Sequence, residues 1–148
     1  MTVDKSNCAE EAVSHFKGGY NCAQSILLAM QKFWNVKNPL EPKVASAFGG
    51  GIGGQGSLCG ALTGGVIAIG LKYGTNRSIP EGREKAYLLA LKFYTQFEKN
   101  CGSVLCRNLI GYDLTNPKEL QEARNSNIFA DKCSHLIEEA IKILISLK

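Results

Sequence analysis

Residues 49–73 of the 148-residue chain read GGGIGGQGSLCGALTGGVIAIGLKY, and this stretch decides the fold. So many glycines cost too much conformational entropy for a helix, so residues 49–56 are predicted to form a loop. From Ser57, a residue type that caps helices, apolar and small residues continue to Tyr73. Glycine and alanine recur there every three or four positions and therefore share faces of one helix. We expect a central helix after a glycine-rich loop, crowded by its neighbours.

The rest of the chain shows the 3.6-residue apolar periodicity of amphipathic helices, and no segment alternates as a strand does. Gly18-Gly19 predicts the end of a first helix, and Asn21 with Gln24 predicts a capping box that opens a second. Further helix starts are predicted at polar residues: Ser78, Asn100, Asn116 and Asp131. We predict an all-α fold, with residues 1–148 forming a single-domain bundle of six to eight helices.

Composition excludes several classes of protein. The 17 Lys and Arg against 13 Asp and Glu are scattered, so the net charge of +4 does not indicate nucleic-acid binding. The longest nearly uncharged apolar run, residues 58–71, is shorter than the roughly 20 residues of a transmembrane span. The first residues lack the apolar core of a secretory signal, which predicts a cytoplasmic protein. The sequence indicates neither a particular redox partner nor an oligomeric state.

Residues 51–56 match the GxGxxG pattern of dinucleotide-binding proteins, but their context does not. That fingerprint needs a preceding strand and an acidic residue about 20 positions later, where this chain has Asn76. The glycines have another use, because an unshielded backbone can point its N–H groups at a cofactor. We expect this cofactor-binding role for four of them, namely Gly53, Gly54, Gly56 and Gly60.

Six cysteines are unusual for a helical cytoplasmic domain. Four lie in the first turn of a predicted helix: Cys22, Cys59, Cys101 and Cys133. The positive end of the helix dipole favours a thiolate there, and we expect Cys59 to be the most strongly affected because it follows the glycine-rich loop. No Cys-x-x-Cys pair occurs, which disfavours thioredoxin-type and zinc-knuckle sites. Covalent c-type haem is excluded because its Cys-x-x-Cys-His motif is missing as well.

The order Cys22, then Cys59-Gly60-Ala61-Leu62-Thr63-Gly64, then Cys106 and Cys133 resembles the C_GCAxxG_C_C family of small redox-active proteins. Residues 19–25, 70–74 and 106–113 match as well, so the resemblance covers nearly the whole chain. The family label spells Gly-Cys-Ala where this chain has Cys-Gly-Ala. The resemblance implies four functional cysteines, Cys22, Cys59, Cys106 and Cys133, as redox-active thiols or metal ligands. It replaces Cys101 by Cys106 and leaves Cys8 outside the site.

Three functions remain open for these cysteines. The first, which we favour, is an iron–sulfur cluster or another cysteine-bound metal used for electron transfer or sensing, because four thiolates suit such centres. The pattern also looks like part of the split-Soret cytochromes, which implies that an iron centre could be shared with them. The second is a metal-free thiol–disulfide protein. The third is a non-catalytic helical interaction or transport-accessory module with cysteines in its core.

Overall fold

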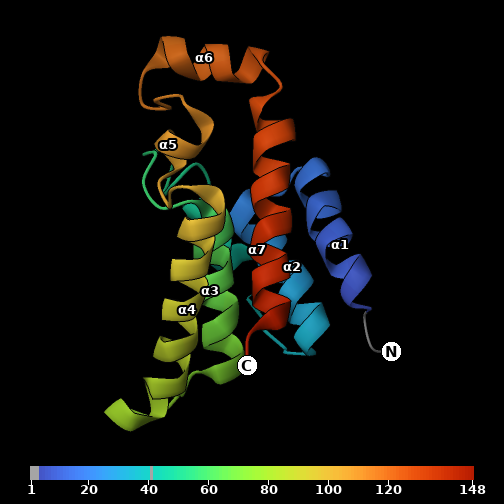
Figure 1. The fold of residues 1–148 in the computed structure, drawn as a ribbon, viewed down its shortest axis with the longest axis vertical. Helices are drawn as coiled ribbons and strands as arrows, with labels where there is room; N and C mark the ends of the chain where they lie inside the picture. The colour runs from blue at the N-terminus through green and yellow to red at the C-terminus, as the bar shows by residue number, and fades with distance from the viewer. Residues whose placement is uncertain (1–3, 41) are drawn as a thin grey trace.

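The computed structural model describes residues 4–40 and 42–148, and helices dominate this part of the chain (Figure 1). The α-helices within these ranges are α1 (Lys5–Lys17), α2 (Cys22–Trp34), α3 (Gly60–Tyr73), α4 (Glu84–Cys101), α5 (Cys106–Ile110), α6 (Pro117–Asn125) and α7 (Ser134–Ser146). Short 3-10 helices η1 (Lys43–Phe48) and η2 (Pro80–Arg83) and a π-helix η3 (Phe129–Cys133) complete them. The described residues contain no strand, only an isolated bridge between Leu58 and Leu105. The predicted all-α fold is confirmed.

Helix α3 lies at the centre of the bundle, packed against α2, α4 and α7. Its glycines allow this close approach. A Cβ added to Gly64 would lie 2.5 Å from the carbonyl oxygen of Ala23 in α2, and one added to Gly65 would overlap Cε2 of Phe93 in α4. The small-residue faces therefore let α3 serve as the crowded central helix that its sequence predicts.

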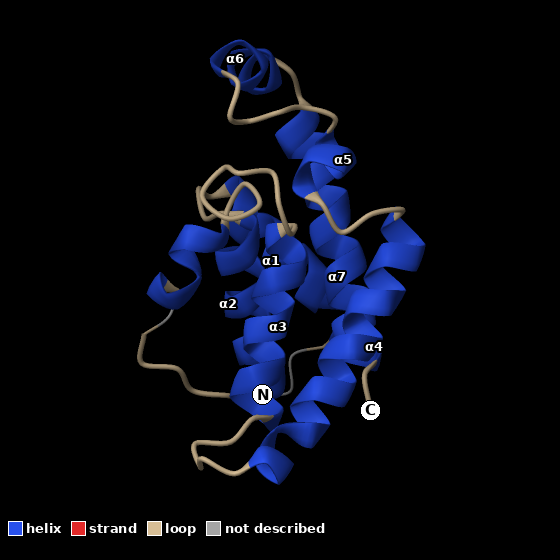
Figure 2. Ribbon diagram, turned by 90° about the vertical axis from the view of Figure 1, so that its left-hand side faces the viewer, coloured by secondary structure: helices blue, strands red, loops and turns tan. Residues whose placement is uncertain are grey.

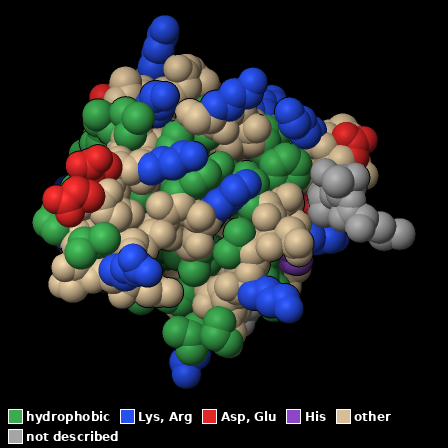
Figure 3. Space-filling view, turned by 90° about the horizontal axis from the view of Figure 1, so that it is seen from below, with side chains coloured by type: hydrophobic (Ala, Val, Ile, Leu, Met, Phe, Trp, Pro, Cys, Tyr) green, Lys and Arg blue, Asp and Glu red, His purple; other side chains and the backbone are tan. Residues whose placement is uncertain are grey.

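The long helices form the body of the molecule, while α5, α6 and the glycine-rich loop lie together at its upper end (Figures 1 and 2). Fully buried side chains from the four helices that pack together form the core, among them Ile26, Leu62, Phe93 and Ile137. Seen from below, the opposite end carries Lys and Arg side chains spread among apolar ones, with acidic side chains at its edges (Figure 3). Within the described ranges, no helix combines the length and apolar character needed to cross a bilayer.

Several predicted helix boundaries were wrong. The helix expected to start at Asn100 does not form, because α4 continues to Cys101 and ends at Gly102, whose φ is +88°. The helix expected from Ser57 begins at Gly60, with Cys59 as its N-cap residue. The last α-helix begins at Ser134 instead of near Asp131, which lies in the π-helix. The start expected at Ser78 becomes η2 from Pro80, followed by α4.

Candidate functional site

Backbone hydrogen bonds hold Cys59 and Cys106 on two adjoining segments. The N–H of Cys59 donates to the carbonyl of Val104 (2.8 Å), and that of Cys106 donates to the carbonyl of Ser57 (2.7 Å). Both bonds flank the isolated antiparallel bridge between residues 58 and 105. As a result, the residue that caps α3 and the first residue of α5 are held close together although they are far apart in the sequence.

The glycine-rich loop folds over these two segments in a left-handed turn. Residues 50–54 all have positive φ, including the non-glycine Ile52 at +68°. Gly51 is the most constrained, since an added Cβ would lie 2.6 Å from the Ser57 nitrogen and 2.7 Å from the Cys106 Cβ. Only glycine combines this backbone conformation with so close an approach. The loop therefore packs directly against the beginning of α5.

The other two cysteines come from α2 and the π-helix. Cys22 is the first residue of α2, which is fixed by the predicted capping box: the Gln24 N–H donates to Asn21 Oδ1 (2.9 Å), and the Asn21 N–H donates to Gln24 Oε1 (3.1 Å). Gly60 lets α3 approach this point, because its added Cβ would be 3.0 Å from the Cys22 Cβ. Cys133 is the last residue of η3, and π-turns within helices often occur at functional sites.

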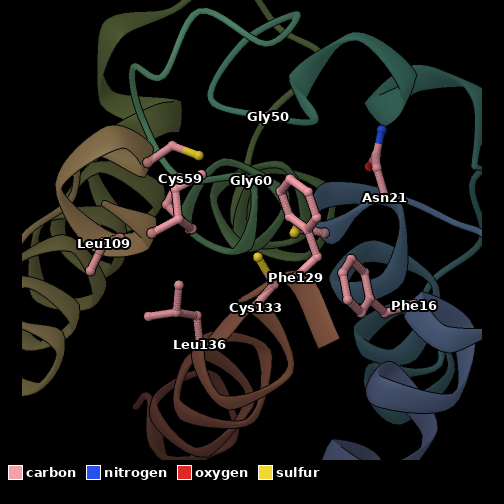
Figure 4. Close-up of a pocket in the computed structure, with 12 residues that line it drawn as sticks. Phe16, Asn21, Gly50, Cys59, Gly60, Leu109, Phe129, Cys133 and Leu136 are labelled. Carbon is pink, nitrogen blue, oxygen red and sulfur yellow. The ribbon is translucent and has the colours of Figure 1, made fainter. Parts of the chain in front are cut away.

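All four cysteines line one cavity of about 170 Å³ (Figure 4). Figure 4 shows Cys59 and Cys133 on different walls, with Phe16 and Phe129 beside Cys133. The remaining lining residues are mostly apolar: Asn21, Gly50, Gly60, Leu109, Ile110 and Leu136 complete the set. Cys8 and Cys101 are not among the lining residues. The structure therefore gathers the four cysteines of the family pattern and leaves the other two outside.

The glycines expected near a cofactor are placed differently from one another. Gly60 lines the cavity, whereas a Cβ on Gly53 or Gly54 would have no neighbour within 4 Å. Gly56 faces Arg107, whose Nε–H donates to the Gly56 carbonyl (3.1 Å). Gly50 lines the cavity instead. Of the four glycines expected near a cofactor, only Gly60 therefore lines the cavity. Gly50 could not be singled out from the sequence, because nothing distinguishes it from the other glycines of the loop.

The aromatic walls of the cavity are also new relative to the sequence analysis. Phe129 precedes Cys133 by one turn, and Phe16 belongs to the apolar stripe of α1, so each looks like an ordinary core residue in the sequence. Asn21 was predicted only as a helix cap, yet it lines the cavity too. Its Nδ2–H₂ donates to the Ser46 carbonyl at 2.9 Å, which ties the start of α2 to η1.

Burial sets the acidity of two of the four thiols. It raises the pKa of Cys59 to about 12 and that of Cys106 to about 11, from an ordinary value of 9.0. For Cys59, hydrogen bonds from the N–H groups of Ala61 and Leu62 act in the opposite direction but are outweighed. The expectation that Cys59 is a low-pKa thiolate is therefore wrong for the protein without a bound group.

Cys22 and Cys133 form a hydrogen-bonded pair. The Cys22 thiol donates to the Cys133 sulfur, which lowers the pKa of Cys133 and raises that of Cys22 well above its ordinary value. Burial and the neighbouring cysteines raise the pKa of Cys22 further. Of the two thiols, Cys133 is therefore the one that ionises first, and Cys22 keeps its proton beside the Cys133 thiolate. Cys133, and not Cys59, is the thiol that the structure favours as a thiolate.

The cysteines surround a space and do not converge on one point. Within residues 4–40 and 42–148, no three His, Cys, Asp or Glu side chains are close enough together to hold a metal ion. A single structural zinc ion takes four ligands around one centre. Four thiol donors do suit an iron–sulfur cluster, in which different iron atoms take different cysteines. The four cysteines therefore match the thiol ligand set of an iron–sulfur cluster.

By its fold and its candidate site, this is a helical protein with four cysteines around one largely apolar cavity. Residues 20–147 match the family model described as "Putative redox-active protein (C_GCAxxG_C_C)", and the chain belongs to this family. A protein of Archaeoglobus fulgidus, described as uncharacterized, is 29% identical over 135 residues, which is 85% of this chain and 83% of the relative. A comparison with solved structures finds no match.

Proposed function

We propose that this protein is a redox protein that holds an iron–sulfur cluster through Cys22, Cys59, Cys106 and Cys133, for electron transfer or sensing. One observation carries the proposal: four cysteines from four separate segments line one cavity, while the remaining two do not. When bound, an iron–sulfur cluster supplies one-electron redox chemistry. The family description supports the redox part of the proposal, and the four-thiol donor set supports the cluster.

The residues around the cavity have distinct parts in this proposal. Phe16, Phe129 and Leu136 keep water from the thiols, which changes the reduction potential of a cluster. A group bound in this largely apolar cavity of about 170 Å³ gains packing contacts with its lining, so we expect it to stabilise the fold. Thiols with a raised pKa, such as those of Cys59 and Cys106, release protons when they become ligands, and uptake is therefore favoured by higher pH.

A second function is favoured by the contact between Cys22 and Cys133. In this version, the Cys133 thiolate and the Cys22 thiol are oxidised together to a disulfide. An S–S bond forms, and two electrons with the accompanying protons pass to a disulfide or quinone-type acceptor. Cys59 and Cys106, with pKa values of about 12 and 11, stay reduced. For either function we place the protein in the cytoplasm as one domain, where reducing conditions keep thiols free.

Anaerobic purification separates the two functions. For the cluster, we expect brown protein with visible absorption, iron and acid-labile sulfide. Replacement of Cys22, Cys59, Cys106 or Cys133 by Ser should each lower the iron content, whereas Cys8→Ser and Cys101→Ser should not, because those cysteines lie away from the cavity. A colourless protein without iron after reconstitution contradicts the cluster. A Cys22–Cys133 disulfide, found by mass spectrometry after mild oxidation of that protein, then supports the second function.

A further inference from the structure

Helix α4 exposes a continuous apolar face on the side opposite the core. Tyr87 is 67% exposed, Leu91 64%, Leu88 53% and Tyr94 37%. These four residues, here called the α4 face, recur at helical spacing and so lie on one side of the helix. The other side of α4 buries Leu89, Phe93 and Phe97 completely or almost so. Single exposed apolar residues are common, but a contiguous patch of this kind marks an interaction site.

A groove continues the α4 face toward α7. It has a volume of about 480 Å³ and lies between the two helices, which are packed side by side (Figure 2). The α7 wall is formed by Ile143, Ser146 and Leu147, and the α4 wall by Leu91, Lys92, Thr95 and Gln96. A ridge of large apolar side chains beside a groove with both apolar and polar walls is a surface into which a second helix can pack.

The charges at the two ends of α4 select the partner. Each end carries the same dipeptide, Glu84-Lys85 and Glu98-Lys99, and all four side chains are exposed. Three ion pairs occur in the described part of the chain, and none involves Glu84 or Lys99. The Lys85 ammonium rests over the Tyr73 ring instead, 4.9 Å from its centroid. Each end of α4 therefore carries one acidic and one basic side chain. As a result, its charges are complementary to those of a second α4 helix that runs antiparallel to it.

We infer that two copies of this chain form a dimer through the α4 face, with the two α4 helices antiparallel. A two-fold axis between Leu91 and Lys92 places Glu84 of each copy opposite Lys99 of its partner. The parallel arrangement would instead oppose Glu84 to Glu84. Covering the four apolar side chains removes on the order of 400 Å² per copy, about half of what each partner gives to a standard interface, and the α7 groove adds to it.

Sedimentation velocity of the purified full chain tests the dimer over a range of concentrations. We expect a dimer for the wild type and at least a tenfold weaker association for Leu91→Glu, which buries a charge at the centre of the interface. The matched control is Leu40→Glu, because Leu40 is 60% exposed but lies far along the chain from α4. It should associate as the wild type does. A wild type that remains monomeric at every concentration overturns the inference and leaves the α4 face to a different partner.

Charge reversal tests the antiparallel register. Glu84→Lys opposes two lysines across the axis and Lys99→Glu opposes two glutamates, so each variant should associate more weakly than the wild type at low salt. Mixing the two variants restores both pairs and should restore the dimer. Circular dichroism confirms that each variant is folded. If the mixture associates no better than either variant alone, the antiparallel register is wrong; if Leu91→Glu remains a dimer, the interface lies elsewhere.

Discussion

The contact between Cys22 and Cys133 controls which thiol reacts first. A thiolate at Cys133 accepts a hydrogen bond from the Cys22 thiol, which lowers the pKa of Cys133. Removing the donor by Cys22→Ala should therefore raise the pKa of Cys133 and move its alkylation to higher pH. The measurement is the alkylation rate of each cysteine against pH, by mass spectrometry of reduced, metal-free protein.

The control for this prediction is Cys8→Ala. Cys8 is fully buried, with its thiol 3.8 Å from the Ala29 carbonyl oxygen, and it does not line the four-cysteine cavity. Its replacement should leave the Cys133 alkylation profile where it is. An unchanged Cys133 profile in Cys22→Ala would show that the two thiols do not interact in solution.

At the scale of elements, Gly64 is a position of α3 where backbone packs against backbone. A methyl group there would lie 2.5 Å from the Ala23 carbonyl oxygen, and this neighbour is backbone that cannot move aside cheaply. Gly64→Ala should therefore lower the free energy of unfolding by about 1–3 kcal/mol. Gly70→Ala, on the same helix, meets nothing within 4 Å and should raise it by about 0.4–1 kcal/mol. Urea denaturation compares the two, and equal effects would contradict the packing argument.

The glycine-rich loop offers a similar comparison at Gly51 and Gly53. Both have positive φ, +72° and +59°, so alanine costs on the order of 1–2 kcal/mol at either position. Only Gly51→Ala also pushes against the Cys106 Cβ, at 2.7 Å. We expect Gly51→Ala to be the less stable variant and to lose iron after reconstitution, while Gly53→Ala keeps it. Wild-type iron content in Gly51→Ala would show that the loop does not position Cys106.

The sequence predicts those elements whose signals are local. The capping box of α2 and the small-residue faces of α3 follow from residue types at fixed spacing, and the structure has both. Asn100 misleads, because it looks like a helix cap while Gly102 nearby ends the preceding helix. The π-helix that carries Cys133 has no local signature at all. This π-helix contacts both α5 and α7, and contacts between separate elements cannot be read from a local pattern.

At the scale of the whole molecule, the four-cysteine cavity illustrates the same limit. Helix starts alone indicate Cys101 in place of Cys106, since neither residue's neighbours reveal the bridge between residues 58 and 105. The family resemblance supplied Cys106, and the structure shows the long-range hydrogen bonds that bring it beside Cys59. Apolar lining residues such as Phe129 could not be told from core residues, because lining a cavity and filling a core require the same chemistry.

The stability of the whole molecule should fall in alkaline solution because buried thiols resist ionisation. Burial raises the pKa of Cys8 from 9.0 to about 11. Between these values the thiol ionises in the unfolded chain but not in the folded protein, so unfolding releases a proton and becomes easier as pH rises. The contribution of Cys8 is fully present below pH 9 and lost by about pH 11, on the order of 2–3 kcal/mol. Urea denaturation of reduced protein at several pH values measures this loss.

The control variant is Cys8→Ala, which removes the titrating thiol. It should be less stable than the wild type at pH 7, because the substitution leaves a cavity. It should nevertheless lose less stability than the wild type between pH 9 and pH 11. Contributions that are common to both proteins cancel in the difference between the two curves. Parallel curves for the two proteins over this range would show that the folded protein ionises Cys8 as readily as the unfolded chain does.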